Sequence, residues 1–122
     1  MREDYKIRLG QYGETLAARF LERHGWRVTS RNFHTRFGEI DLIAEKPDEI
    51  LFCEVKTRTS DDYGYPETAV DYFKVRRLMK AIGFYSQARR INKFWRLDIV
   101  SVEINRENKT AKFNWFKNIG EN

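Results

Sequence analysis

Small and apolar residues recur at intervals of three and four near the start of the chain. From Gly10 to about His24 these positions are Gly13, Leu16, Ala17, Phe20 and Leu21. This spacing predicts a helix, and Gly25 stands where a left-handed cap would end it. The first expected element is therefore a helix over 10–24.

Strand-like patterns follow this helix. The segment WRVTSRNF predicts a short strand, and GEIDLIAE and ILFCEVKT predict two more, joined by the polar segment KPDE. The last two strands should form a hairpin in which Glu45 pairs with Ile50. A two-residue turn at Pro47 and Asp48 gives the same register.

The second half of the chain predicts a loop, a helix and a strand pair. TSDDYGYPET is rich in turn formers, and WRLDIVSVEI, NRENK and TAKFNWFK predict two strands with a turn between them. Between these segments, an amphipathic helix is expected from Ala69 to about Arg90. Its apolar positions are Val70, Phe73, Leu78, Ala81, Ile82 and Tyr85. This order favours an α/β fold, a mixed central β-sheet flanked by helices.

Length and composition narrow the class of protein. The chain has 122 residues, of which 41% are hydrophobic, which suits a single domain over 1–122 with a real core. No window resembles a membrane span or a signal peptide, and the single cysteine, Cys53, lies in the apolar run ILFCEV. We therefore expect a cytoplasmic protein without a disulfide and with Cys53 buried. The net charge of +5 favours an anionic partner such as nucleic acid.

The expected hairpin register gathers charges at one end of one face. Counting back from Glu45 and Ile50 places Asp41 opposite Glu54 and Glu39 opposite Lys56. Because side chains alternate along a strand, one face is wholly apolar and should join the core, with Ile40, Leu42, Ala44, Leu51, Cys53 and Val55. The other face holds Glu39, Asp41, Ile43, Phe52, Glu54 and Lys56.

Two carboxylates directly opposed in a hairpin need a reason, because like charges there destabilise the pair. A shared Mg²⁺ would supply one, since it favours carboxylate and water oxygens. Lys56 could then orient an attacking water, so that Asp41, Glu54 and Lys56 form a phosphodiester hydrolysis site. The alternative, of about equal weight on this pattern alone, is a solvated face with Glu39–Lys56 and Glu54–Lys56 ion pairs.

A family resemblance favours the catalytic interpretation. GEIDLIA, a short turn and an apolar run ending in EVK resemble the PD-(D/E)xK nuclease motif at Asp41, Glu54 and Lys56, although no proline precedes Asp41. More widely, GQYGETLAARFLERHGW, RNFHTRFGEIDLIA, FCEVKTR and RLDIV are similar to the YraN-like family of small bacterial proteins. That family is related to archaeal Holliday-junction resolvases. The resemblance implies a restriction-endonuclease-like fold, action on DNA, branched DNA included, and a homodimer.

Two acidic residues outside the hairpin are further candidates. In the related nucleases a glutamate of the first helix reaches the metal, and Glu14 matches that position; the alternative is a first-turn glutamate favoured by the helix dipole. Asp98 in RLDIV recurs in the resemblance without a clear role, and we expect a structural pair with Arg96 near the site.

Basic residues form the expected nucleic-acid surface. Arg36 and Arg58 flank the motif strands, and the second helix carries Lys74, Arg76, Arg77 and Lys80. Such a band is usually a solvated helix face, yet it could also contact backbone phosphates.

The sequence thus supports a leading function and two rivals. The leading hypothesis is an endonuclease that uses Mg²⁺ or Mn²⁺ to hydrolyse DNA, with Asp41, Glu54 and Glu14 as ligands and Glu39 and Asp98 in supporting positions. The main rival is a non-catalytic nucleic-acid-binding or assembly module with the same fold. RNA is a less favoured substrate, because no motif of the RRM or KH type occurs.

Overall fold

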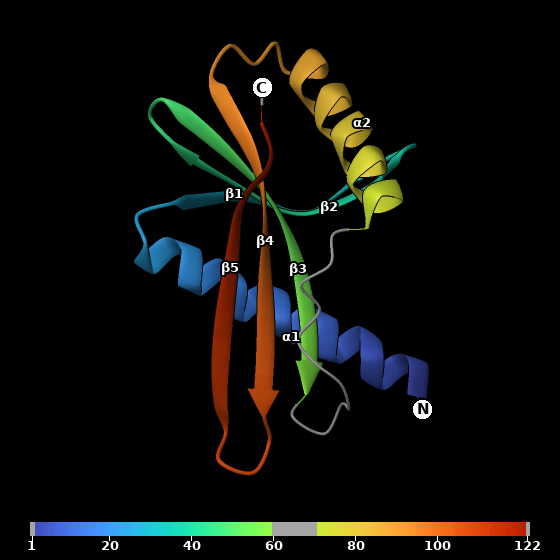
Figure 1. Ribbon diagram of the computed structural model, residues 1–122, viewed down its shortest axis with the longest axis vertical. Helices are drawn as coiled ribbons and strands as arrows, with labels where there is room; N and C mark the ends of the chain where they lie inside the picture. Colours follow the sequence, from blue (N-terminus) through green and yellow to red (C-terminus); the bar gives the residue numbers. More distant parts are fainter. Residues whose placement is uncertain (1, 60–70, 122) are drawn as a thin grey trace.

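The protein is described by a computed structural model over residues 2–59 and 71–121. Its elements in chain order are α1 (Arg2–Arg23), β1 (Arg27–Thr35), β2 (Gly38–Lys46), β3 (Glu49–Thr59), α2 (Tyr72–Ala88), β4 (Phe94–Asn105) and β5 (Thr110–Glu121). The strands form one sheet in the order β1-β2-β3-β4-β5, in which only β3 and β4 run parallel (Figure 1). The expected α/β fold with a mixed sheet is confirmed.

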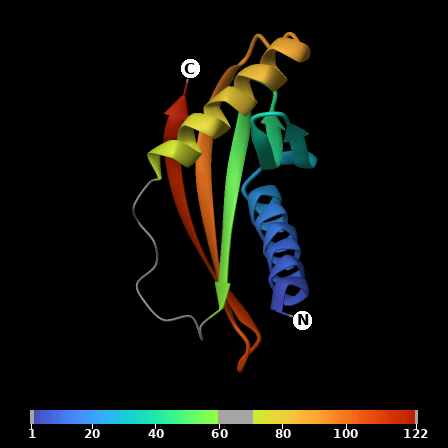
Figure 2. The same cartoon turned by 90° about the vertical axis from the view of Figure 1, so that its right-hand side faces the viewer.

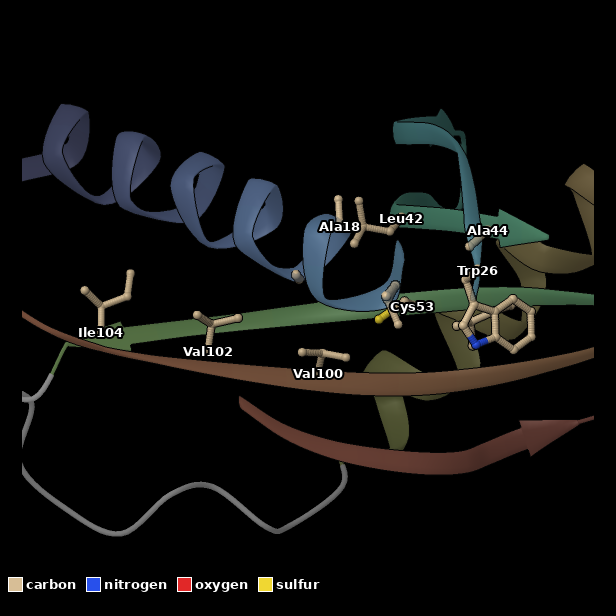
Figure 3. Close-up of a cluster of buried hydrophobic side chains, with 11 residues drawn as sticks. Ala18, Trp26, Leu42, Ala44, Cys53, Val100, Val102 and Ile104 are labelled. Atoms are coloured by element: carbon tan, nitrogen blue, oxygen red, sulfur yellow. The ribbon is translucent and has the colours of Figure 1, made fainter. Parts of the chain in front are cut away.

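The two helices cover opposite faces of this sheet (Figure 2). α1 packs against one apolar cluster, of which Ala18, Leu42, Cys53 and Val100 are members (Figure 3). α2 packs against a second cluster that includes Ile43 and Phe52. Cys53 is 1% exposed, as expected for a small buried hydrophobe. Among the described residues, no helix combines the length and apolar character that a membrane crossing requires.

α1 begins at Arg2, eight residues before the expected start. Residues 3–9 of the added turns, EDYKIRL, are mostly exposed, so they lack the apolar periodicity on which the prediction depended. The C-terminal end is as expected: Gly25 has a φ of +89°, and the Trp26 amide donates to the Leu21 carbonyl at 3.1 Å. These features form a Schellman cap, which turns the chain directly into β1.

α2 begins at Tyr72 rather than Ala69, because Asp71 has an extended backbone and caps the helix. Its carboxylate accepts from the backbone amides of Phe73 and Lys74 at 2.9 and 3.2 Å. Val70 and residues 60–68 of the expected loop lie outside the described residues, whereas Thr59, the first residue of that loop, is the last residue of β3. The buried stripe of Leu78, Ala81, Ile82 and Tyr85 is confirmed.

The expected place of Phe73 in that stripe is wrong, since its side chain is 74% exposed. The residue that continues the stripe toward the N-terminal end is Lys74, four residues before Leu78 and eleven before Tyr85. A charged residue therefore takes the position that faces the sheet.

The β2–β3 hairpin has the predicted register, with Glu45 paired to Ile50. Pairing stops at Leu42 and Cys53, however, and β2 then follows β1. The expected ladder positions of Asp41 opposite Glu54 and Glu39 opposite Lys56 are therefore wrong. Beyond the last pair, Ile40 joins the α2-side cluster instead of the α1-side face that was expected. This separation of the two strands creates the space for the site.

Candidate metal centre

A cleft of about 400 Å³ opens where β2 separates from β3. Its walls come from α1, β2, β3 and α2, which meet here although the helices cover opposite faces of the sheet. The lining residues are Glu14, Gly38, Glu39, Asp41, Glu54, Val55, Lys74, Arg77 and Leu78. Four carboxylates and two basic side chains thus share one cleft.

Asp41 and Glu54 remain neighbours in spite of the lost pairing. Asp41 Oδ2 accepts a hydrogen bond from the Val55 backbone amide at 2.9 Å. A side chain of β2 therefore takes up a backbone donor of β3 that lies beyond the last β2–β3 backbone pair. Glu54 is 3% exposed and lies within hydrogen-bond reach of Asp41. The two acidic residues that the motif singled out are therefore brought together.

Glu14 is brought to the same place by a close approach of α1 to β3. A Cβ atom added at Gly13 would overlap the Thr57 side chain, so glycine is required for this packing. Because α1 begins at Arg2, the first-turn interpretation of Glu14 is wrong. Its side chain is only 13% exposed and faces the cleft.

Asn32 connects two of these carboxylates, and the sequence analysis missed it. Its Nδ2 donates to Glu14 Oε1 and Oε2, both at 3.1 Å, and to Glu39 Oε1 at 2.7 Å. Asn32 has a φ of +51°, a conformation that asparagine tolerates better than most residues. An asparagine inside the strand-like run WRVTSRNF was the one available signal. The Asn32 side chain therefore holds Glu14 and Glu39 side by side.

Burial and like charges raise the pKa values of two acids in the cleft. Burial is the largest cause for Asp41, followed by the hydrogen bond to Glu54 and its charge, and together they raise the pKa of Asp41 to about 8. Burial also raises the pKa of Glu14, against the hydrogen bond from Asn32 that lowers it. Groups of this kind, perturbed and gathered in one cleft, are typical of functional sites.

Lys74 forms an ion pair with Glu54 from across the cleft. Burial alone would lower the pKa of Lys74, but the hydrogen bond to Glu54 and the charges of Glu54 and Asp41 raise it instead. Lys74 thus reaches into the cleft, while its side chain remains 45% exposed. Arg76, Arg77 and Lys80 are exposed, and Arg77 also borders the cleft.

Other predicted residues stand outside the cleft lining. Lys56 projects to the same side of β3 as Glu54, two residues further along the strand. Arg36 is exposed and lies over the Phe37 ring, with its guanidinium carbon 4.9 Å from the ring centre. Arg58 lies in β3, at partial exposure.

Asp98 is held on the α1 face of the sheet and does not line the cleft. Its Oδ2 is 3.2 Å from Arg96 Nη2 and accepts from Trp115 Nε1 at 2.7 Å. Its Oδ1 accepts from the Asn118 amide at 2.9 Å, beside an irregularity in the pairing of β4 with β5. The structural pair with Arg96 is confirmed, and the expected position near the site is not.

The donor set fits a hard divalent cation. One carboxylate oxygen from each of Glu14, Glu39 and Asp41 lies within 4.8 Å of the other two. Mg²⁺ and Mn²⁺ favour such oxygens. This group includes Glu39, which was expected only in a supporting position, whereas Glu54 is paired with Lys74.

A model of the "Uncharacterised protein family UPF0102" matches residues 13–102, a range that contains the whole cleft lining. The chain belongs to the UPF0102 family. The resemblance to the YraN-like family is thereby confirmed.

Several UPF0102 proteins are similar along most of their length. One from Syntrophus aciditrophicus is 43% identical over 107 residues, which are 87% of this chain and 84% of the relative. Another from Caldicellulosiruptor saccharolyticus is 38% identical over 114 residues, or 93% and 97% of the two chains. A third, from Syntrophomonas wolfei, is 52% identical over 77 residues, or 63% and 67%.

Proposed function

We propose that this UPF0102 protein is a metal-dependent endonuclease that hydrolyses phosphodiester bonds of DNA. The observation that carries the proposal is the cleft, in which Glu14, Glu39 and Asp41 hold carboxylate oxygens within 4.8 Å of one another. Like charges at such distances in a partly buried site favour a bound cation. The PD-(D/E)xK-like motif and the basic surface beside the cleft support DNA as the substrate.

Glu14, Glu39 and Asp41 would hold Mg²⁺ or Mn²⁺, with Glu54 as the remaining carboxylate of the cleft. A cation bound there would polarise the scissile phosphate and lower the pKa of an attacking water. Asn32 holds Glu14 and Glu39 in place, and the Val55 amide holds Asp41. Such fixed ligands reduce the reorganisation that catalysis would otherwise require.

Two lysines have different proposed roles. Lys56 is the proposed catalytic lysine, which orients the attacking water and offsets the charge that develops on the phosphate oxygens. Lys74 positions Glu54 through their ion pair. Arg77, at the rim of the cleft, would contact a phosphate of the same strand.

The test is cleavage of labelled linear, single-stranded and four-way-junction DNA with Mg²⁺, Mn²⁺ or EDTA. We expect cleavage that requires the metal and is lost in Lys56→Ala, whereas the control Lys112→Ala, at an exposed position of β5 outside the cleft, cleaves normally. Tight DNA binding without cleavage under any of these metal conditions would instead support a non-catalytic binding module.

A further inference from the structure

A stripe of aromatic and basic side chains runs along α2 beside the cleft. Its members follow one another at intervals of four, three and four residues, which places them on one line of the helix: Phe73, Arg77, Lys80 and Phe84. We call these four residues the α2 stripe. Because Arg77 also lines the cleft, the α2 stripe borders the cleft directly.

None of the four residues of the α2 stripe belongs to either core cluster. Phe73 is 74% exposed and Phe84 is 43% exposed, while the buried positions of α2 lie on another side of the helix. An aromatic ring in water contributes little of its burial free energy to folding. Two such rings on the same line of a helix therefore indicate a surface that is covered by something else.

The two basic residues between the rings decide what that partner is. An apolar partner surface would have to remove Arg77 and Lys80 from water without pairing their charges, which is unfavourable. A nucleic-acid strand offers phosphates to the charges and base faces to the rings. This combination of basic groups and stacking rings is typical of sites for single-stranded nucleic acid.

We propose that the α2 stripe binds a single strand of DNA, with unpaired bases stacked on Phe73 and Phe84 and phosphates against Arg77 and Lys80. The inference rests on the proposed endonuclease function, and it names the substrate as DNA with unpaired nucleotides beside the bond that is cut. Phe73 and Phe84 are roughly 16 Å apart along the helix axis, from a rise of about 1.5 Å per residue. The strand contact therefore spans several nucleotides.

The test is binding of the full chain to labelled DNA in EDTA, measured by fluorescence anisotropy at fixed salt. The probes are a single strand of DNA, a duplex of equal length and a strand of equal charge that lacks bases, and the unaltered protein is also measured with an RNA strand of the same sequence. Phe73→Ala should weaken binding of the single strand by roughly 5- to 30-fold, in line with the loss of one stacked base. It should change binding of the baseless strand by less than about 2-fold, because only phosphate contacts remain there.

Phe94→Ala is the matched control, because Phe94 is 73% exposed at the start of β4 and belongs to neither the cleft nor the α2 stripe. It should leave all three affinities unchanged. Equal losses for Phe73→Ala on the normal and baseless strands would overturn the stacking proposal. So would the absence of single-strand binding by the unaltered protein, or tighter binding to RNA of the same sequence.

Sedimentation of the same variants separates this proposal from self-association. If the unaltered protein is a dimer that Phe73→Ala dissociates, a second copy covers the α2 stripe and the proposal is overturned. Binding is measured without metal, so the test works even if the protein cleaves no DNA. In that case, a loss of strand affinity in Phe73→Ala would support strand binding by the α2 stripe without supporting the nuclease proposal. Metal-dependent cleavage with unchanged strand affinity in Phe73→Ala would refute the α2 stripe and leave the nuclease proposal standing.

Discussion

Asp98 and Asp41 are both aspartates of the central sheet, but the groups around the two carboxylates differ in charge and hydrogen-bonding character. Asp98 is fully buried and is met by donors: Arg96, the Trp115 indole and the Asn118 amide. Asp41 receives one backbone amide and lies near the carboxylates of Glu54 and Glu14, while Lys74 of the same cleft is paired with Glu54. A buried acid surrounded by donors completes the fold, whereas an acid surrounded by acids requires either a proton or a cation. The comparison therefore separates a structural aspartate from a candidate ligand.

The sharpest way to break this comparison is to remove Asp98. Asp98→Ala would leave Arg96 and the Trp115 indole without their buried partner, and we expect the free energy of unfolding to fall by about 3–5 kcal/mol. Urea unfolding followed by circular dichroism measures this loss. A change of less than about 1 kcal/mol would show that Asp98 is not the structural residue that its contacts indicate.

Asp41→Asn should have the opposite effect, a large loss of DNA cleavage with little change in the fold. We expect metal-dependent DNA cleavage to fall by at least roughly 10²–10³-fold, because a carboxylate ligand at the reacting centre is lost. The fold should persist, as judged by circular dichroism. Asp48→Asn, an exposed aspartate in the hairpin turn, is the control and should cleave normally. Full cleavage by Asp41→Asn would remove the residue from the proposed mechanism.

The placement of Glu14 can be tested through the glycine beside it. Gly13→Ala should destabilise the protein by about 1–3 kcal/mol, because its methyl group would overlap Thr57 and force α1 away from β3. Gly10→Ala lies in the same helix with no atom within 4 Å of the added Cβ, so it should be neutral or stabilising by up to about 1 kcal/mol. Equal unfolding midpoints for the two variants would contradict this packing.

The smallest predicted effect concerns the dependence of stability on pH. The pKa of Asp41 is about 8 in the folded protein against an ordinary value of 3.8. Between these values the folded state holds more protons than the unfolded chain, so the free energy of unfolding should fall as pH rises. In EDTA, Asp41→Asn should therefore be more stable than the unaltered protein near pH 8, by on the order of 1 kcal/mol after allowance for solvent screening. Identical urea curves for the two proteins at that pH would argue against a crowded carboxylate cleft.

Much of the fold was accessible from the sequence because its signals are local. Three predictions are confirmed: the Glu45–Ile50 register, Gly25 at the end of α1, and the burial of four α2 residues against the sheet. These four are Leu78, Ala81, Ile82 and Tyr85. The first turns of α1 were missed because a charged, exposed helix carries no apolar period. The sequence thus predicts the elements that bury a face more reliably than those that do not.

The site was only partly accessible, because it depends on where strands separate. Alternation along an ideal hairpin brought Asp41 and Glu54 together, but it could not show that pairing ends at Leu42 and Cys53. Asn32 in β1 and Lys74 in α2 lie outside the motif itself, and only the fold brings them to the carboxylates. Contacts of this kind follow from tertiary structure and leave little local signal.

The most direct test of the account is the binding of Mn²⁺, measured by the loss of the free-ion signal in electron paramagnetic resonance. The unaltered protein should bind the ion at a site that Asp41→Asn weakens by at least about 10-fold, while Asp48→Asn binds as before. Equal Mn²⁺ binding by all three proteins, or no binding by the unaltered one, would contradict the claim that this carboxylate cleft is a metal centre.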